Sequence, residues 1–317
     1  MENIAILTGG DSAEYNISLL SANTVLKHLN NNKYNGVIVH LQDGEYKVGE
    51  QKINTTEFTY IKDNTTIRFD KIFMALHGPP AENGLIQDYL DKINLPYTSC
   101  NARVSALTFN KFECNKTLNR FGFRCINSIL VDSSEKITED EILKKIGFPC
   151  FVKPNGSGSS YGISKVKQID ELPQAIKDAL DHDNKVIIES FIKGIEVSCG
   201  VYFDGDQVKS LPITEIVSDN EFFDYEAKYK GKSQEITPAR ISKQLTLEIQ
   251  ATTINIYKKI KLTGICRVDF IIKDNKPYII EINTIPGFSE ESIIPKQLKV
   301  ANISLLGIFD LCLKNIN

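Results

Sequence analysis

A chain of 317 residues can form two domains or three small ones, with room for a core in each. Its apolar content of 42% and charged content of 24% are ordinary for a soluble protein. A net charge of −3 with no block of Lys or Arg argues against a nucleic-acid partner and against an anionic membrane surface.

The start of the chain and its cysteines favour a cytoplasmic protein. The first ten residues lack the basic and long apolar segments of a signal peptide, and no apolar run approaches the ~18 residues of a membrane span. The seven cysteines form no CxxC pair and the four histidines show no ligand spacing, so neither a zinc site nor a disulfide framework is expected. Most of the thiols are therefore predicted to be reduced and buried.

The first third of the chain alternates between strand and helix patterns. The predicted strands are 4–7, 37–41, 71–76 and 95–97, and the predicted helices are 17–29 and 85–93. This alternation predicts an α/β domain with a mostly parallel sheet and helices on both faces. Ligands of such sheets bind beyond the carboxyl ends of the strands, where residues 8–14 and 77–84 lie.

Two polar residues in these segments, Glu14 and His77, can be interpreted either as structural or as functional. The glycines at 9 and 10 lack the G-x-G-x-x-G spacing, which disfavours a nicotinamide dinucleotide site. Glu14 opens a helix, where a carboxylate acts as a cap about as often as a ligand. His77 at a strand end is, taken alone, more often structural than catalytic.

The middle of the chain predicts a phosphate-binding loop. A helix is expected over 102–121, carrying Lys111, and two strands then flank the Gly/Ser-rich segment 154–162. The N–H groups and hydroxyls of such a segment can donate to phosphate oxygens. It is not a Walker A loop, because Gly-Lys-Ser/Thr is missing. Lys153 at its base favours a phosphate site over a plain flexible loop.

Residues between two further predicted strands, 185–189 and 197–203, suit a nucleoside. Phe191 and Ile192 offer an apolar wall for a base, and Glu189 and Glu196 offer acceptors for hydroxyls and an amino group. The same residues are also compatible with a simple strand turn.

The polar and aromatic segment 219–240 is long for a connection inside a compact domain. Such connections are usually functional lids or disordered insertions, and its aromatic and basic content argues against disorder. We therefore predict a lid, followed by helices at 245–260 and 303–313.

Residues 267–272 and 278–283 are rich in β-branched side chains and flank turn-forming residues, so they predict a hairpin. Side chains alternate between the faces of a strand. A loop with an odd number of residues, such as 274–276, therefore pairs Asp269 with Glu281 and Arg267 with Asn283 on one face. The opposite face is then apolar and consists of Val268, Phe270, Tyr278, Ile280 and Ile282.

Two carboxylates and an amide oxygen on one face form a hard-oxygen set. Mg²⁺ takes such ligands when substrate phosphates supply the rest. A surface salt bridge is the simpler alternative, but four polar groups converging on otherwise apolar strands favour the metal site.

In this order, the motifs resemble those of the D-alanine–D-alanine ligases of the ATP-grasp superfamily, over nearly the whole chain. The matching segments are 9–14, 77–84, 105–107 with Lys111, 152–162, 225–229 and 267–287. The resemblance implies an ATP-grasp fold (α/β and α+β) with an amino-terminal Rossmann-like domain. It also implies three parts: 1–104 with the first D-alanine subsite, 105–187 with the phosphate loop, and 188–317 with the lid, the metal site and the second subsite.

The resemblance implies a binding role for each motif residue. The ATP phosphates would be bound by Lys111, Lys153, Ser159, Ser160 and Lys228. The adenine and ribose would lie against Glu189, Phe191, Ile192 and Glu196. Magnesium, or manganese in its place, would be bound by Asp269, Glu281 and Asn283.

For the amino acids, the resemblance implies that Glu14 holds the ammonium of the first D-alanine, with His77 near its carboxylate, while Ser292 binds the carboxylate of the second. Tyr229 and Ser159 would complete a latch with Glu14, and Arg267 and the Gly287 N–H would stabilise an oxyanion. The implied reaction joins two D-alanines through a D-alanyl phosphate, for peptidoglycan precursor synthesis. A homodimer is implied as well.

Two departures and three alternatives accompany the resemblance. The common Gly-Glu-Asp-Gly after the histidine is Ala81-Glu82-Asn83-Gly84 here, and Asn155-Gly156-Ser157-Gly158 lacks the charge often found before the serines. A ligase with other partners, such as D-alanine and D-lactate or two L-amino acids, is the nearest alternative. A non-catalytic nucleotide-binding module and a nicotinamide-linked dehydrogenase are disfavoured by the full set of charged residues and by the missing fingerprint.

Overall fold

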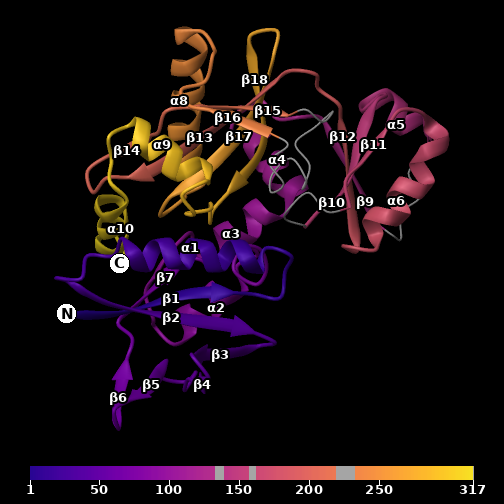
Figure 1. Ribbon diagram of the computed structural model, residues 1–317. Coiled ribbons are helices and arrows are strands. Elements are labelled where there is room, and N and C mark those ends of the chain that lie inside the picture. Colours follow the sequence, from indigo (N-terminus) through magenta and orange to yellow (C-terminus); the bar gives the residue numbers. More distant parts are fainter. Residues whose placement is uncertain (133–138, 157–161, 219–232, 317) are drawn as a thin grey trace.

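The computed structural model describes residues 1–132, 139–156, 162–218 and 233–316 (Figure 1). The predicted site residues Ser159, Ser160, Lys228 and Tyr229 lie outside these ranges, as does most of the predicted lid. The described chain forms three main sheets with a cavity between them. Among the described residues, no helix is both long and apolar enough to cross a membrane.

The alternating pattern of the first third builds the first sheet. Its centre is parallel, in the order β2 (Tyr34–Gln42), β1 (Glu2–Gly9), β7 (Lys71–Met74) and β8 (Tyr97–Thr98), which confirms the predicted sheet. Two antiparallel strands that were not predicted extend one edge, β3 (Glu45–Val48) and β4 (Gln51–Lys52). A separate hairpin is formed by β5 (Thr59–Lys62) and β6 (Thr65–Arg68).

Helices cover both faces of this sheet, as predicted. Ile4 and Ile6 of β1 pack in one cluster with α1 (Tyr15–Lys27) and α10 (Leu305–Lys314), whereas Ala5 and Leu7 face α2 (Leu85–Lys92). Alternate side chains of a strand point to opposite faces, so one strand supports both layers.

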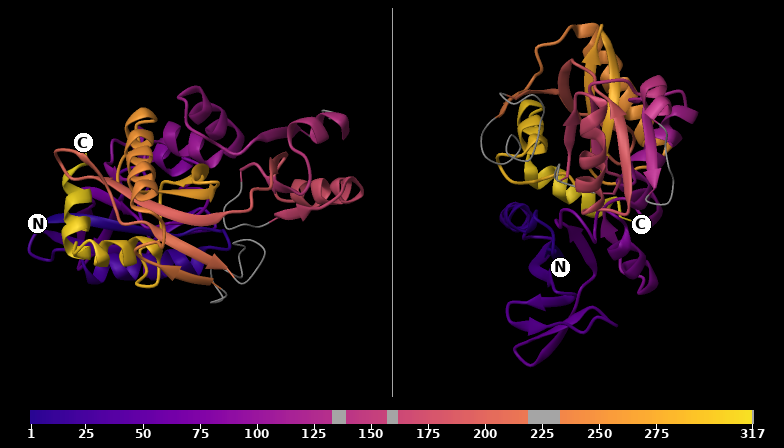
Figure 2. Two further views of the ribbon diagram at one scale, coloured as in Figure 1. Left: turned by 90° about the horizontal axis from the view of Figure 1, so that it is seen from above. Right: turned by 90° about the vertical axis from the view of Figure 1, so that its right-hand side faces the viewer.

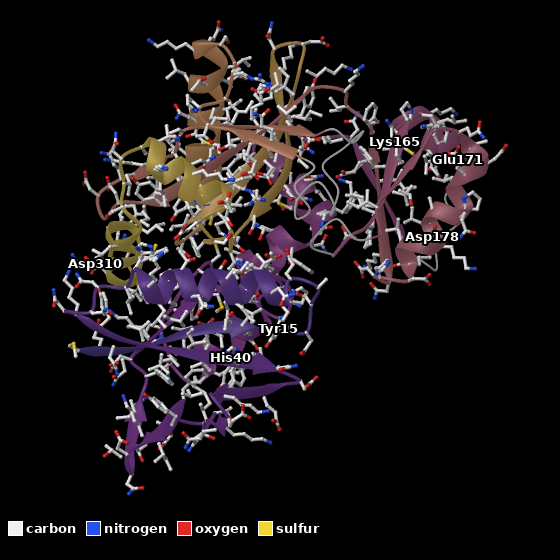
Figure 3. The ribbon with its side chains drawn as sticks, viewed as in Figure 1. Tyr15, His40, Lys165, Glu171, Asp178 and Asp310 are labelled. Carbon is white, nitrogen blue, oxygen red and sulfur yellow. The ribbon has the colours of Figure 1, made fainter. Side chains whose placement is uncertain are left out.

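Helix α10 ties the end of the chain to this first sheet. Its Asp310, labelled in Figure 3, accepts hydrogen bonds from Lys33 Nζ at 2.9 Å and Tyr34 Oη at 3.0 Å. These hydrogen bonds hold together two segments that are far apart in the sequence.

The second sheet is antiparallel and lies to one side of the molecule (Figure 1). Its order is β11 (Ser164–Val166), β10 (Cys150–Pro154), β12 (Lys185–Ser190) and β9 (Ser128–Asp132). It packs with α5 (Glu139–Lys145), α6 (Leu172–Leu180) and the short helix η1 (Ile169–Glu171) around its own apolar cluster. This small core is what places Lys153 and Glu189 on neighbouring strands.

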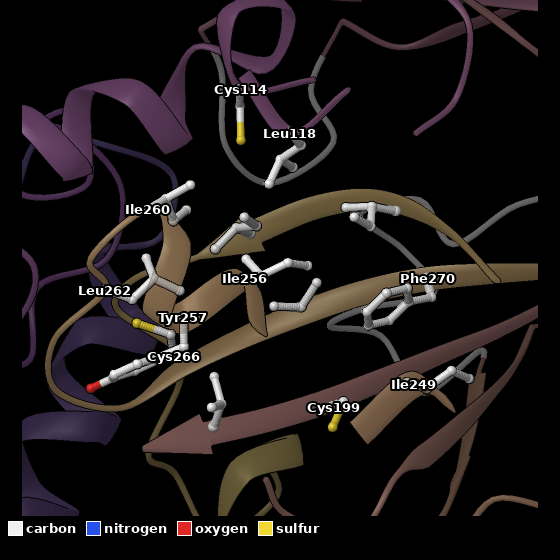
Figure 4. Close-up of a cluster of buried hydrophobic side chains, with 14 of the residues drawn as sticks. Cys114, Leu118, Cys199, Ile249, Ile256, Tyr257, Ile260, Leu262, Cys266 and Phe270 are labelled. Carbon is white, nitrogen blue, oxygen red and sulfur yellow. The ribbon is translucent and has the colours of Figure 1, made fainter. Parts of the chain in front are cut away.

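The third sheet contains the predicted hairpin. Its order is β16 (Ser233–Ile236), β15 (Thr214–Ser218), β13 (Ile195–Phe203), β17 (Cys266–Lys273) and β18 (Lys276–Asn283), with β14 (Val208–Ser210) also paired to β13. Helix α8 (Lys243–Lys259) packs Ile249, Ile256 and Tyr257 against Phe270 and neighbouring residues, as Figure 4 shows. Helix α9 (Ile293–Val300) also contacts this sheet. In the right-hand view of Figure 2, the first sheet lies at one end of the molecule and the other two at the opposite end.

The single helix predicted over 102–121 is wrong in one respect. The structure has two helices, α3 (Ala102–Phe109) and α4 (Lys111–Arg120), separated at Asn110. Asn110 has extended backbone angles, and its side-chain oxygen accepts a hydrogen bond from the Glu113 N–H at 3.0 Å. An asparagine N-cap starts a new helix because it satisfies an otherwise unpaired N–H. The break makes Lys111 the first residue of α4.

The hairpin register is confirmed, but the predicted loop length is wrong. Asp269 pairs with Glu281 and Arg267 with Asn283, although the turn has only two residues, Asp274 and Asn275. Both have positive φ, 50° and 56°, which suits a two-residue hairpin turn. A bulge after Asp269 pairs Phe270 with Ile279 and restores the predicted pairing.

The bulge also changes which side chains of β18 face the core. Ile279, not predicted there, is 1% exposed and belongs to the core cluster. Ile280, predicted for the apolar face, lines the cavity instead, and Tyr278 is only partly buried. Val268, Phe270 and Ile282 are buried as predicted.

Candidate active site

A cavity of about 830 Å³ lies where the three sheets meet. Every predicted site residue within the described ranges lines it: Glu14, His77, Lys111, Lys153, Glu189, Phe191, Ile192, Glu196, Arg267, Asp269, Glu281, Asn283, Gly287 and Ser292. The first and last of these residues, Glu14 and Ser292, are 278 positions apart in the sequence. The fold thus brings the separate motifs to one place.

The side of the cavity that is predicted to bind phosphate contains a buried ion pair. Lys153 Nζ lies 2.5 Å from Glu189 Oε2, and Asn115 donates to Glu189 Oε1 at 3.2 Å. Burial lowers the pKa of Lys153, but the neighbouring Glu189 carboxylate outweighs it and leaves that pKa above its usual value. Lys153 of β10 is therefore a permanent cation inside the cavity, and the carboxylate of Glu189 on the neighbouring strand β12 is its counter-ion.

The wall of the cavity that is predicted to face a nucleoside includes two residues that the sequence analysis missed. Phe151 packs edge-on to Phe191 with ring centroids 5.7 Å apart, and Lys165 Nζ lies 4.1 Å from the Phe191 centroid. Both missed residues line the cavity with Ile192. Phe151 pairs with Lys165 across β10 and β11, and Phe151 shares a face with Lys153, so strand alternation was the available signal.

The hard-oxygen face is formed by the hairpin and one neighbouring strand. Arg267 Nε lies 2.9 Å from Asp269 Oδ1, and Arg267 Nη2 lies 2.9 Å from Oδ2. Ser198 of β13, paired with Asp269 across the strands, donates its hydroxyl to Oδ1. Asn283 Oδ1 accepts from the Ile285 N–H at 3.0 Å. The oxygens of these side chains are therefore oriented by hydrogen bonds.

This face fits a small divalent cation. Directly paired residues of antiparallel strands have Cβ atoms ~5 Å apart, so the carboxylates of Asp269 and Glu281 can reach one ion. A carbonyl oxygen such as Asn283 Oδ1 has two lone pairs, of which the Ile285 N–H uses one. Carboxylate and amide oxygens are hard donors of the kind that magnesium prefers.

At the other end of the cavity, His77 is tied to the protein through both ring nitrogens. Nε2 lies 2.8 Å from Ser21 Oγ, and Nδ1 lies 2.9 Å from the Ile285 carbonyl oxygen. The Phe288 N–H donates to the same Ser21 oxygen at 3.0 Å. Burial lowers the pKa of His77, so the ring is neutral and donates from Nδ1 to the carbonyl. His77 thus joins the first sheet to the loop that contains Gly287.

The predicted second subsite gathers at the start of α9. Ser292 is the N-cap residue of this helix, and its Oγ lies 2.7 Å from Ser289 Oγ. A Cβ built on Gly287 would approach Ser292 Oγ to 2.7 Å, so only glycine leaves this space open. The backbone at Gly287 and the hydroxyl of Ser292 are therefore direct neighbours.

Glu82 is a further cavity residue to which the sequence analysis gave no role. Burial and the nearby Glu14 raise the pKa of its carboxyl to about 8, with Glu281 adding to the effect. The only sequence signal was its place in the loop after His77. At neutral pH the Glu82 carboxyl is therefore mostly protonated, and the negative charge at this end of the cavity comes from Glu14 and Glu281, which suits an ammonium group.

Comparisons with known proteins agree with this arrangement. Residues 3–100 match the family model "D-ala D-ala ligase N-terminus", and residues 117–311 match "D-ala D-ala ligase C-terminus". The D-alanine–D-alanine ligase of Flavobacterium johnsoniae is 50% identical over 314 residues, covering 98% of this chain and 97% of the relative. That of Christiangramia forsetii is 47% identical over 313 residues, covering 97% and 96%.

Solved structures are similar over the same length. The VanG D-Ala:D-Ser ligase of Enterococcus faecalis is 29% identical with a TM-score of 0.87, covering 99% of this chain and 98% of that one. The ATP complex of the Bacillus anthracis D-alanine–D-alanine ligase is 28% identical with a TM-score of 0.81, covering 99% and 97%. With both family models matched in order along one chain, the protein belongs to the D-alanine–D-alanine ligase family and has its ATP-grasp fold.

Proposed function

We propose that the protein joins two molecules of D-alanine into D-alanyl-D-alanine while ATP is cleaved to ADP and phosphate. The observation that supports this most is the hairpin face, where Asp269 and Glu281 are paired beside Arg267 and Asn283. That face shares one cavity with the buried cation of Lys153 and with Glu14. The dipeptide would serve peptidoglycan precursor synthesis.

The first step activates a carboxylate, which is by itself a poor electrophile. A carboxylate oxygen of the first D-alanine attacks the γ-phosphorus of ATP, so that D-alanyl phosphate forms and ADP leaves. Lys111 and Lys153, with Ser159, Ser160 and Lys228, would bind the phosphates. Magnesium, or manganese in its place, would be held by Asp269, Glu281 and Asn283 and would neutralise phosphate charge. The nucleoside would lie against Glu189, Phe191, Ile192 and Glu196.

In the second step, the amine of the second D-alanine attacks the acyl carbon. Ser292 would hold its carboxylate. Arg267 and the Gly287 N–H would stabilise the oxyanion, a role worth about 3–4 kcal/mol per donor. Phosphate then leaves as the peptide bond is completed and the amine loses its proton.

Glu14 would hold the ammonium of the first D-alanine throughout. His77 would face its carboxylate from a ring already fixed by Ser21 and Ile285. A latch of Tyr229, Ser159 and Glu14 would close the lid and keep water from the acyl phosphate.

We also propose the finer organisation that the family resemblance suggests. The chain would divide into 1–104, 105–187 and 188–317 and act as a cytoplasmic homodimer. All seven cysteines are free, buried thiols, which agrees with a reducing compartment.

The test is phosphate release from Mg-ATP with D-alanine, with L-alanine, or with D-alanine plus D-lactate, and identification of products by mass. Release with D-alanine alone and formation of the dipeptide is the expected result. If no amino acid stimulates release, the proposed reaction is wrong. The similarity to a D-Ala:D-Ser ligase makes D-serine the second acceptor to include.

A further inference from the structure

We propose that Gln297 is a positioning residue that connects α9, the helix of the second amino-acid subsite, to strand β13. This strand lies beside the hard-oxygen face of Asp269, Glu281 and Asn283, which is called the metal face from here on. Gln297 would thereby set the separation between Ser292 and Asp269. This inference rests on the proposed roles of those two residues. Gln297 itself does not line the cavity, and it is fully buried.

The pairing along one edge of β13 is interrupted. Strand β13 pairs with β17 over residues 195–201, while its other edge pairs with β15 at 196–198 and with β14 at 201–203. Within the described part of the chain, no strand pairs with that edge at residues 199 and 200. Backbone groups in a buried interruption need partners from elsewhere, because an unpaired buried N–H or C=O is costly.

The Leu211 N–H donates to the Gly200 carbonyl at 2.8 Å, and the side chain of Gln297 supplies partners for the Gly200 N–H and the Ser198 carbonyl. Its Oε1 accepts from the Gly200 N–H at 3.0 Å, and its Nε2 donates to the Ser198 carbonyl at 2.9 Å. Nε2 also donates to Thr214 Oγ1 of β15 at 3.1 Å. A carboxamide has the same donor and acceptor as a peptide group, so Gln297 takes the place of a missing ladder residue.

This connection holds α9 close to the sheet. A Cβ built on Gly200 would lie 2.6 Å from Gln297 Oε1 and 2.7 Å from Ile294 Cδ1, both on α9. The close approach therefore depends on glycine at position 200. Ser292 occupies the N-cap position of the same helix, five residues before Gln297, so the subsite residue and the anchoring residue move as one unit.

The same strand orients the metal face. Ser198, whose carbonyl is bound by Gln297, donates its hydroxyl to Asp269 Oδ1, and the hydroxyl is buried. A change at Gln297 is thus passed to Asp269 through one residue. Partners of metal-binding side chains typically alter metal affinity by ~10- to 100-fold when they are lost.

The experiment compares Gln297→Met with a matched control, Gln250→Met. Gln250 of α8 also uses its amide on this region of the sheet, donating to the Leu211 carbonyl at 3.2 Å, but it has no bond to α9 among those described. The first measurement is calorimetric binding of a non-hydrolysable ATP analogue at increasing Mg²⁺. Gln297→Met is expected to need about ten-fold more Mg²⁺ for half-maximal binding, and Gln250→Met less than two-fold more.

The second measurement separates the two half-reactions at saturating Mg²⁺. Hydroxylamine traps the acyl phosphate as a hydroxamate, while dipeptide formation reports the second step. For Gln297→Met we expect hydroxamate formation within about two-fold of wild type and a roughly ten-fold higher KM for the second D-alanine. Equal behaviour of the two variants in both measurements overturns the inference.

Two further outcomes are also decisive. If wild type forms no dipeptide, the proposed reaction fails, but the binding measurement still decides whether Gln297 orients the metal face. If Gln297→Met does not fold, Gly200→Ala displaces the same side chain without removing it. It is expected to change Mg²⁺ dependence and second-subsite KM in the same direction, and an unchanged profile would contradict the proposal.

Discussion

Arg267 donates hydrogen bonds to both carboxylate oxygens of Asp269, with Nε 2.9 Å from Oδ1 and Nη2 2.9 Å from Oδ2. The side chains are only 14% and 13% exposed, so this two-pronged pair lies largely out of water. The residue proposed to stabilise the oxyanion is thus oriented by a residue proposed to bind the metal. A planar fork makes this possible, whereas an ammonium group cannot form it.

Replacing Arg267 by lysine tests this pairing. We expect kcat for the dipeptide to fall about 100-fold, because the oxyanion loses a correctly oriented donor, while acyl phosphate formation is less affected. Arg240→Lys is the control, since Arg240 forms a similar fork on Glu215 at 2.9 Å and 2.7 Å outside the cavity lining. Equal losses in both half-reactions of Arg267→Lys would place its role elsewhere.

Replacing Glu281 by glutamine tests the metal face. The change keeps the shape of the side chain but removes a charge paired with Asp269 across the hairpin. We expect Mg-ATP turnover to drop at least ~100-fold with the melting temperature nearly unchanged. Glu248→Gln, an exposed glutamate paired with Arg124, is expected to be neutral. Near-normal turnover of Glu281→Gln removes the metal assignment.

Lys153→Met is predicted to unfold more readily as well as to lose activity. The substitution leaves Glu189 buried at 2% side-chain exposure without its cation. An uncompensated buried charge costs about 3–5 kcal/mol, which urea denaturation can measure. The double variant Lys153→Met with Glu189→Gln is expected to recover most of that stability while remaining inactive. A single variant as stable as wild type would contradict this account of the pair.

Gly287→Ala is predicted to weaken the second subsite. The added methyl would meet Ser292 Oγ at 2.7 Å and push aside the residue proposed to bind the second carboxylate. We expect the KM for the second D-alanine to rise about ten-fold, measured by dipeptide formation at fixed ATP. Gly307→Ala is a matched control, since its methyl also meets a serine hydroxyl, Ser304 Oγ at 3.1 Å, but in α10. An unchanged KM would show that Ser292 can move without loss.

The contribution of His77 to stability is predicted to fall as the solution is acidified through the ordinary pKa of histidine, about 6.5. Burial lowers the pKa of His77, so the unfolded chain binds a proton there before the folded protein does. At this residue protons therefore favour the unfolded state below that pH, and the contribution of His77 to stability rises with pH across the window. Melting temperatures at pH 5.5 and 7.5 test this, because the loss in His77→Gln relative to wild type should be larger at pH 7.5 than at pH 5.5. His40→Gln, at a residue outside the cavity lining, should keep the wild-type difference.

Local patterns in the sequence were sufficient for most elements and for the four polar residues that share one face of the hairpin. Alternation along the hairpin placed Asp269, Glu281, Arg267 and Asn283 on one face, because side-chain direction in a strand depends on residue parity alone. The strand and helix patterns of the first third predicted the parallel sheet for the same reason of periodicity. The assignment of roles to single residues came from family resemblance and stays a prediction.

Only the tertiary structure decided features that depend on contacts between distant segments. The bulge that exchanges Ile279 for Ile280 depends on how β18 packs against the core, and the start of α4 at Lys111 depends on Asn110, which Asn155 also contacts at 3.0 Å. Gln297 has an unremarkable place in the sequence, yet it completes a strand edge nearly a hundred residues away. Sequence periodicity determines which face of a strand or helix a side chain occupies. Which residue it then contacts or hydrogen-bonds is determined only when the sheets and helices pack together.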